Sequence, residues 1–296
     1  MLFPQNILVI DYGTRNIKGL LYQTGPAGRK ILRAESLPII RLEQEEVAEG
    51  QERINEYEYN LVRFVQSFFP EETSYVLNLP LSKVFVRDIS MPVVPEKQFR
   101  EVMAFEVENY LPISLEEAEV IGKSWAVEED QASALTFTSP NENLSQAVLP
   151  LLRSQGSVRM LSLDCVGLAS VVSILPPEDI KDRVIAQIDI GCEYTIFNVI
   201  QNGELVFTRH IAVGGLAVDW MLKDELGMDI YQAEQKKLAL DLDIGPDQLQ
   251  IERSDRYFKN NKLTREQLLD LTARTRSVYA EILEEIERSI LSLKVP

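Results

Sequence analysis

Two short turns carry residue types that could bind a phosphate group and its metal ion. Asp11, Gly13 and Thr14 lie between two half-apolar runs, and Asp189 and Gly191 occupy the same places in a second such segment. Glycine permits a tight bend in which backbone N–H groups form a nest for an anion. A carboxylate ending the preceding strand can hold Mg²⁺ through water, and the Thr14 hydroxyl can donate to a phosphate oxygen. Together the turns are typical of a nucleotide-phosphate clamp.

The same D-x-G turns are also common hairpin chemistry without any ligand. Either turn alone is better explained as structural, whereas the pair favours phosphate binding because each follows one apolar strand and precedes another. The chain contains neither GxxxxGK[ST] nor GxGxxG, so the two common phosphate-loop alternatives have no support.

The flanking elements predict two related lobes. Alternation of apolar residues and turn chemistry predict an antiparallel meander at residues 7–12, 17–23 and 30–39, and the same logic recurs in three strands within residues 184–215. Such duplication implies two lobes with a cleft between them. The remaining elements expected outside the insertion are a loop or solvated helix start at 41–51, strands at 74–80 and 157–164, and helices at 53–69, 165–175, 215–226, 231–240 and 264–293.

An inserted α/β subdomain is expected in the first lobe. Its predicted elements are a strand at 84–92, a helix at 95–112 stopped by proline, strands at 120–127 and 132–138, and a helix at 142–155. We therefore expect residues 1–84 and 157–183 to form the first lobe, 85–156 the subdomain, and 184–296 the second lobe.

Composition excludes several classes of function. The formal charge of −16 and pI of about 4.7 leave no basic surface for nucleic acid. Two cysteines without CxxC spacing and a single histidine disfavour thiolate metal sites and disulfides. The N-terminus lacks signal-peptide features, and the longest nearly apolar run, residues 166–177, is too short to span a bilayer. We expect a cytoplasmic protein with no direct membrane span, held at any membrane by a partner.

The sequence resembles the actin-like ATPase superfamily, and within it the PilM-like proteins of type IV pilus assembly and their GspL relatives of type II secretion. The D-x-G turns indicate the superfamily. More specific are the E-x-E-x-x-L-P segment within MPVVPEKQFREVMAFEVENYLPISLEEAEV and the F-T-R-x-I-x-x-G-G segment within IDIGCEYTIFNVIQNGELVFTRHIAVGG. The resemblance implies an α/β, actin-like (ribonuclease H-like) two-lobed fold with a small inserted subdomain.

The resemblance also implies site residues, cofactors and partners. ATP and Mg²⁺ are the implied cofactors, with Asp11 and Asp189 at the metal. An inner-membrane assembly protein of the PilN or GspL/GspM type is the implied partner, bound beside the subdomain through its cytoplasmic segment, and a secretion ATPase is a further one. The implied nucleotide-binding positions are Asp11, Gly13, Thr14 and Lys18 in the first loop, Asp189, Gly191 and Thr195 in the second, Gly214 and Gly215 before a helix, and Glu234 and Lys237 near the adenosine.

Departures from the family pattern keep two other functions open. The expected adenosine loop, a strand ending in Gly-Gly after the last helix, does not appear before the chain stops at LKVP, and Arg15 and Cys192 are unusual in their loops. A nucleotide-free platform of the GspL type is one alternative. An active ATPase or kinase is the other, with Asp164 as the nearest candidate to position a water. We expect nucleotide binding rather than efficient hydrolysis.

The remaining reactive residues have simpler explanations. His210 lies on a strand without a neighbouring nucleophile, and Cys165 opens an apolar helix as a small core residue. Glu106 and Glu108, two apart on a helix, cannot share a face as an acid and base pair.

Overall fold

The computed structural model describes residues 5–26, 28–42, 55–68, 73–154, 156–240 and 265–293. It is a mixed α/β structure with three sheets, and it divides into two compact units. One unit comprises Met1–Gln187 with Asn198–Thr208, and the other comprises Ile188–Phe197 with Arg209–Pro296. Most of the predicted segment 41–51, from residue 43 onward, lies outside the described residues.

The first unit contains a five-stranded sheet in the order β3-β2-β1-β4-β8. The predicted meander is confirmed, because β2 pairs antiparallel with both β1 and β3. β4 and β8 then extend the sheet in parallel from β1. The strands are β1 (Gln5–Tyr12), β2 (Asn16–Gly25), β3 (Gly28–Pro38), β4 (Thr73–Leu79) and β8 (Ser157–Leu163).

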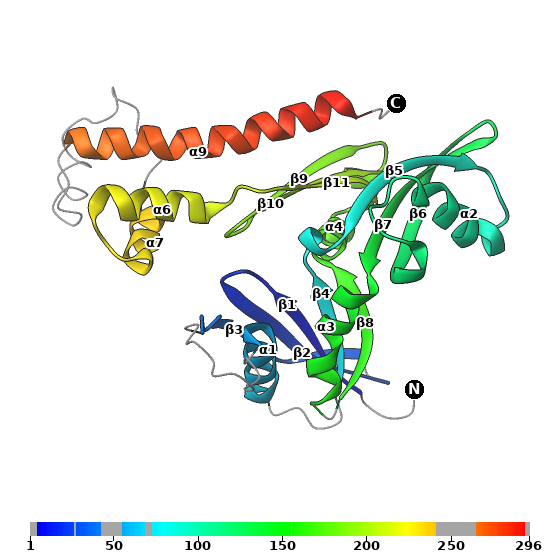
Figure 1. The fold of residues 1–296 in the computed structure, drawn as a ribbon, viewed down its shortest axis with the longest axis horizontal. Coiled ribbons are helices and arrows are strands. Elements are labelled where there is room, and N and C mark those ends of the chain that lie inside the picture. Colours follow the sequence, from blue (N-terminus) through cyan, green and yellow to red (C-terminus); the bar gives the residue numbers. More distant parts are fainter. Residues whose placement is uncertain are drawn as a thin grey trace. The chain divides into compact units, whose positions relative to one another are not determined.

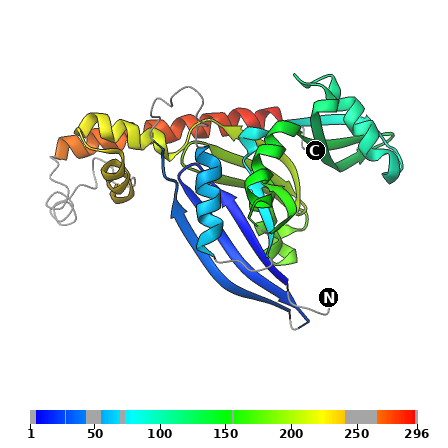
Figure 2. The ribbon, with the colours of Figure 1, turned by 60° about the horizontal axis from the view of Figure 1, so that its bottom comes forward.

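Helix α1 (Glu56–Ser67) covers one face of strands β1–β3 (Figure 2). Asn55 caps its start by accepting the amides of Tyr57 and Glu58, which satisfies two N–H groups left free by helix geometry. Gly19 of β2 lets the helix approach closely, since an added Cβ would lie 2.7 Å from Phe64. The apolar face of α1 therefore packs directly on the sheet, with Leu61 and Phe64 fully buried.

The inserted elements form a separate three-stranded antiparallel sheet in the order β5-β7-β6. α2 (Glu96–Glu108) packs on it, burying Met103 and Val107 against Met91 and Ala134. The elements are β5 (Phe85–Pro92), β6 (Ala118–Glu128) and β7 (Gln131–Pro140), with 3-10 turns η1 (Leu81–Lys83) and η2 (Leu115–Glu117).

Two predicted helices end earlier than expected. α2 stops at Glu108 rather than at Pro112, because proline disfavours helical geometry in the residue before it and offers no amide. The helix predicted over 165–175 is α4 (Asp164–Ser170) followed by a 3-10 turn, η3 (Val171–Ile174).

Helix α3 (Asn141–Leu152) links the inserted region to the five-stranded sheet. It contacts α1 and β8 as well as β7, and Tyr57 of α1 donates its hydroxyl to the Ala147 carbonyl at 3.2 Å. Figure 1 shows α3 beside α1. The helix predicted as the last element of the subdomain therefore also supports the first sheet.

The third sheet repeats the first meander. Its order is β11-β10-β9, as β3-β2-β1 in the first sheet, and the boundary between the two units passes through it. Its strands are β9 (Val184–Ile190), β10 (Thr195–Gln201) and β11 (Glu204–Ile211), preceded by α5 (Pro177–Ile180). The predicted duplication of the strand meander is thus present in the fold.

The second unit is otherwise helical. α6 (Gly215–Leu226), α7 (Ile230–Ala239) and α9 (Arg265–Ser292) share a core of Val218, Leu222, Ala233 and Leu271. α9 is a single helix that runs alongside α6 (Figure 1). Arg209 of β11 anchors it through the Glu285 carboxylate at 2.7 Å and the Ser289 hydroxyl at 2.9 Å.

A buried amide network lies within the first unit. Asn198 of β10 donates to the Cys165 carbonyl at 3.0 Å and to the Gln187 side chain at 3.1 Å, and accepts from the Thr208 hydroxyl at 2.7 Å. Burial raises the pKa of the Cys165 thiol to about 12. Cys165 is therefore an inert core residue, as its apolar surroundings predicted.

Within the described ranges, no helix has both the length and the apolarity needed to cross a bilayer.

Candidate functional site

The first D-x-G turn joins β1 to β2. The Gly13 amide donates to the Asn16 carbonyl at 3.1 Å, and a Cβ at Gly13 would lie 2.9 Å from that oxygen. Glycine is thus required by the closeness of the turn itself. Two neighbouring carbonyls are also engaged, because Thr14 accepts from the Arg41 side chain at 3.0 Å and Arg15 from the Ile39 amide at 2.9 Å.

Asp11 and Lys18 face each other across β1 and β2. They are register partners, and the Lys18 Nζ lies 3.8 Å from the Asp11 carboxylate. Both side chains are well exposed, so the pair is weak and available to a ligand. They line an open hollow whose other residues are Val9, Gly19, Leu20, Ala34, Glu35 and Ser36.

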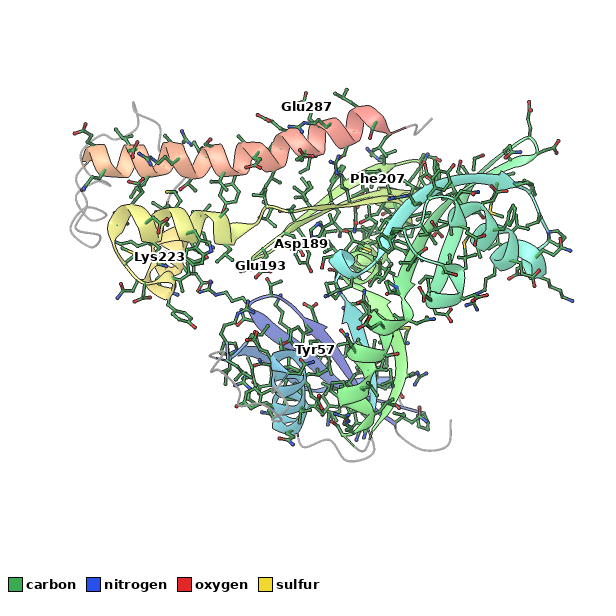
Figure 3. All side chains as sticks on the ribbon, viewed as in Figure 1. Tyr57, Asp189, Glu193, Phe207, Lys223 and Glu287 are labelled. Atoms are coloured by element: carbon green, nitrogen blue, oxygen red, sulfur yellow. The ribbon has the colours of Figure 1, made fainter. Side chains whose placement is uncertain are left out.

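The second D-x-G turn joins β9 to β10 with the same backbone geometry. The Gly191 amide donates to the Tyr194 carbonyl at 3.0 Å, and a Cβ at Gly191 would lie 2.8 Å from that oxygen. Asp189 is exposed at the end of β9, near Glu193 in the turn (Figure 3). Thr195 is fully buried and donates its hydroxyl to the Val213 carbonyl at 2.8 Å, so it holds the loop rather than presenting a free donor.

The start of α6 is attached to this second turn. The Gly215 amide donates to the Gly191 carbonyl at 2.9 Å, and the Leu216 amide donates to the Cys192 carbonyl at 2.7 Å. A Cβ at Gly214 would lie 2.5 Å from the Cys192 oxygen, so only glycine fits there. The first helical amides thus bind the loop, although the positive end of the helix dipole still points toward it.

Three amides in these loops remain available. Those of Thr14, Cys192 and Gly214 donate to no backbone carbonyl of the described residues. Within each unit, an anion would therefore meet the amide of the residue after the D-x-G glycine, joined in the second unit by the amide of the residue before α6, rather than the glycine amides of the turns.

Lys237 and Glu234 both lie on α7. The Lys237 Nζ lies 2.9 Å from the Asp219 carboxylate and donates to the Gly215 carbonyl at 3.0 Å. Asp219 is completely buried on α6. Glu234 is half-buried, three residues before Lys237. Lys237 is therefore directed at the first turn of α6.

The structure brings together Gly191, Thr195, Gly214, Gly215 and Lys237 in the second unit. Asp11, Gly13, Thr14 and Lys18 form a separate group in the first unit. Across the described part of the chain, no three histidine, cysteine, aspartate or glutamate side chains gather into a metal site.

A family model described as type IV pilus assembly protein PilM matches residues 9–251. The chain belongs to this family.

One solved structure agrees in fold, and two others show a weaker similarity. The "PilM-PilN type IV pilus biogenesis complex" matches with a TM-score of 0.68 and 20% identity, covering 96% of this chain and 76% of that one. The cytoplasmic domain of EpsL, an inner membrane component of the type II secretion system of Vibrio cholerae, has a TM-score of 0.45 and 11% identity, covering 76% of this chain and 78% of that one. EutJ of Carboxydothermus hydrogenoformans scores 0.44 at 10% identity, over 97% of this chain and 73% of that one.

The PilM family fold is actin-like, as the resemblance in the sequence implied. The five-stranded mixed sheet, the repeated meander and the inserted β5-β7-β6 sheet are the features by which this chain shows that fold.

Two other candidates from the sequence have structural roles in this member of the PilM family. The Asp164 carboxylate accepts the Leu81 amide at 3.0 Å and the Cys165 amide at 2.7 Å, so both oxygens are engaged. The His210 ring stacks on Tyr194 with centroids 4.7 Å apart, and burial lowers the pKa of its imidazole. This arrangement supports the second turn, in agreement with the non-catalytic interpretation.

Asp219 is the site residue that sequence reasoning missed. It is an acid on the buried face of α6, one turn after Gly215 and next to Val218, which is also fully buried. An acidic residue among apolar positions of a predicted helix is a usable signal, because a buried carboxylate requires a partner. The pattern could not indicate that the partner would be Lys237, which lies on the following helix.

Proposed function

We propose that this chain is a cytoplasmic scaffold of type IV pilus assembly, held at the inner membrane by a PilN-like partner and binding ATP with Mg²⁺ through residues of its D-x-G loops. The observation that carries the nucleotide part is the repetition of one turn geometry. Gly13 and Gly191 close the same hydrogen-bonded turn, at 3.1 and 3.0 Å, in corresponding places of two repeated sheets. Family membership supports the pilus role.

The residues present fit a hydrated metal–nucleotide complex. Mg²⁺ keeps several waters and is usually bound through one or two carboxylates plus substrate phosphates, so a dense protein cage is unnecessary. Asp11 and Asp189 would supply those carboxylates, and both are accessible. Mg²⁺ would neutralise phosphate charge, while Lys18 and the amides of Thr14, Cys192 and Gly214 would orient the phosphate oxygens.

The geometry favours binding over turnover. Both oxygens of Asp164 already accept backbone amides, so this carboxylate is a poor candidate to position an attacking water. We infer that bound ATP acts as a conformational ligand that stabilises one arrangement of the scaffold.

A nucleotide-free platform of the GspL type is the second candidate. The observation favouring it is that the amides of Gly13, Gly191, Gly215 and Leu216 all donate to carbonyls of the protein itself. These turns are therefore fully formed without a ligand.

Calorimetric titration with ATP, with and without Mg²⁺, separates the two candidates. Under the proposal the wild-type chain binds Mg·ATP, Asp11→Ala loses at least tenfold in affinity, and Glu35→Ala, a change elsewhere in the same hollow, binds normally. Absence of binding by the folded wild-type chain would select the platform.

Partner binding has a separate test on α2. Phe105 and Tyr110 expose 66% and 59% of their surface, whereas Val102 packs against the subdomain core. Phe105→Glu should therefore weaken binding of the cytoplasmic segment of a PilN-like protein without unfolding the chain. Glu101→Lys on the same helix is the control for a general charge effect. Unchanged affinity in Phe105→Glu would place the partner site elsewhere.

A further inference from the structure

Lys237 makes two contacts that hold α7 against the first turn of α6. Its Nζ lies 2.9 Å from the Asp219 carboxylate and 3.0 Å from the Gly215 carbonyl oxygen. A Cβ at Gly215 would lie 2.9 Å from the same Nζ, so the ammonium is in direct contact with the helix backbone. The lysine side chain is only 17% exposed, and that of Asp219 is 0% exposed.

This pair is strongly constrained by its surroundings. A buried carboxylate without a counter-charge is costly, so Asp219 requires the ammonium of Lys237. The Lys237 ammonium in turn forms an ion pair with the Asp219 carboxylate and donates a hydrogen bond to the Gly215 carbonyl. Neither group can leave without exposing the other to a penalty.

The peptide groups of α6 extend the link to the second D-x-G turn. Gly215 accepts from Lys237 through its carbonyl and donates through its amide to the Gly191 carbonyl at 2.9 Å. Leu216 continues the attachment by donating to the Cys192 carbonyl at 2.7 Å. A continuous series of hydrogen bonds therefore joins α7 to the loop that carries Gly191 and Cys192.

We propose that Lys237 is a positioning residue of the second phosphate loop, acting through Asp219 and the first turn of α6 rather than by touching the nucleoside. The consequence of this positioning is that Lys237 and Asp219 determine the affinity for Mg·ATP, and this consequence rests on the proposed function. The positioning of the loop by Lys237 does not depend on nucleotide binding, because the contacts that hold the loop involve protein groups alone. A displacement of α7 is transmitted to the loop through this pair.

Cys192 provides a readout in the loop itself. The chain has two cysteines, of which Cys165 is fully buried with a raised pKa and Cys192 is partly exposed. The rate at which a disulfide reagent such as DTNB modifies the native protein therefore reports opening of the Cys192 loop. Cys192→Ser, which should show no fast phase, verifies this assignment.

The test compares Lys237→Met with Lys237→Arg, Asp219→Asn and the neighbouring control Lys236→Met, all without nucleotide. Lys237→Met should raise the Cys192 modification rate about tenfold, because the loss of one buried charge-assisted hydrogen bond makes local opening of the loop more frequent. Lys237→Arg, which keeps the charge, should restore most of the protection, and Asp219→Asn should give an intermediate rate. Lys236→Met should match the wild type.

A titration with Mg·ATP then separates the outcomes. Weaker binding in Lys237→Met with an unchanged Cys192 rate would mean that Lys237 contacts the nucleotide directly, and the proposal would be wrong. If no variant, nor the wild type, binds ATP, the proposed function fails while the Cys192 rates still decide the positioning role. If Lys237→Met does not fold, the near-isosteric Asp219→Asn decides: a raised rate supports the proposal and an unchanged rate overturns it.

Discussion

The two D-x-G turns have the same backbone and different anchors. In both, the glycine amide donates to the carbonyl three residues later, and in both an added Cβ would lie within 3 Å of that oxygen, at 2.9 Å for Gly13 and 2.8 Å for Gly191. Beyond the turn the resemblance ends. The Thr14 carbonyl of the first turn accepts from the exposed side chain of Arg41, whereas the Gly191 carbonyl of the second accepts from the helix backbone at Gly215.

The side chains that follow each turn also differ, in their charge and in their exposure to solvent. Lys18 in β2 is exposed and faces Asp11, whereas the corresponding position in β10 is the buried Ile196. The first turn thus offers charged side chains on a loop held by Arg41 and the Ile39 amide, and the second offers backbone groups on a loop fixed by α6. The two copies of the repeated unit thus share the bend and differ in the groups that hold it and surround it.

The largest expected difference is in the stability lost when Gly214 or Gly13 is replaced by alanine. Gly214→Ala would place a Cβ 2.5 Å from the Cys192 oxygen and 2.7 Å from that of Gly191, both rigid backbone atoms. We expect it to lower the free energy of unfolding by about 3 kcal/mol, against about 1–2 kcal/mol for Gly13→Ala. Urea unfolding measures both. Gly167→Ala, whose Cβ meets only ordinary contacts, is the control, and equal losses in the first two variants would contradict the difference in anchoring.

The next largest effect on stability is expected at the first buried residue after each turn. Ile17 and Thr195 are both fully buried, but Thr195 donates to the Val213 carbonyl at 2.8 Å. Thr195→Val should cost about 1–3 kcal/mol because it leaves that carbonyl without its partner. Ile17→Val should cost about 0.5–1.5 kcal/mol as a methylene deletion. Thermal unfolding compares them, and Thr195→Ser, which keeps the hydroxyl, should retain more stability than Thr195→Val.

A smaller effect is expected at Arg41. Its guanidinium bonds the Thr14 carbonyl at 3.0 Å and pairs with Glu56 at 2.9 Å, with most of the side chain exposed. Arg41→Ala should change global stability by less than about 1 kcal/mol. Hydrogen exchange should nonetheless quicken at residues 14–16 and remain unchanged at 191–194. Faster exchange at both turns would show that they are not independently anchored.

The smallest effect is a pH dependence in the second turn. Burial lowers the pKa of His210 below its ordinary 6.5, so the folded state binds fewer protons than the unfolded state at mildly acidic pH. Its contribution to stability is therefore complete above about pH 6.5 and falls as the pH drops toward the folded pKa. His210→Phe keeps a ring against Tyr194 and should flatten this part of the stability curve. Identical curves for both proteins would contradict the assignment.

Local patterning was sufficient to predict most elements of the fold. Alternating apolar residues placed β1, β2 and β3 within two residues at every end, and the second meander was visible for the same reason. The parallel additions of β4 and β8 were not predicted, because pairing between strands distant in sequence depends on contacts that no local period encodes. The early end of α2 has a local cause instead, because Pro112 has no amide to donate to the Glu108 carbonyl, which accepts from the Leu111 amide at 3.1 Å.

The candidate site was predicted less completely than the fold. Gly13, Gly191 and Gly214 lie at close backbone approaches, whereas a Cβ at Gly215 would meet the Lys237 side chain. The role of Lys237 could not be predicted because it depends on Asp219, 18 residues earlier on another helix, and the resemblance placed that lysine near an adenosine. Likewise, the hydroxyl of Thr195 is a donor whose partner only the folded structure reveals.

The Asn198 network has a consequence for how the chain assembles. Its amide and carbonyl oxygen find partners in α4, β9 and β11 at one alignment of the strands only. A slip of β10 by one residue would turn this side chain to the opposite face and break its three hydrogen bonds to Cys165, Gln187 and Thr208. The network therefore raises the free energy of misaligned pairings of β10 relative to the native one. Replacing Asn198 by an apolar residue would remove this difference, even where the native alignment still formed.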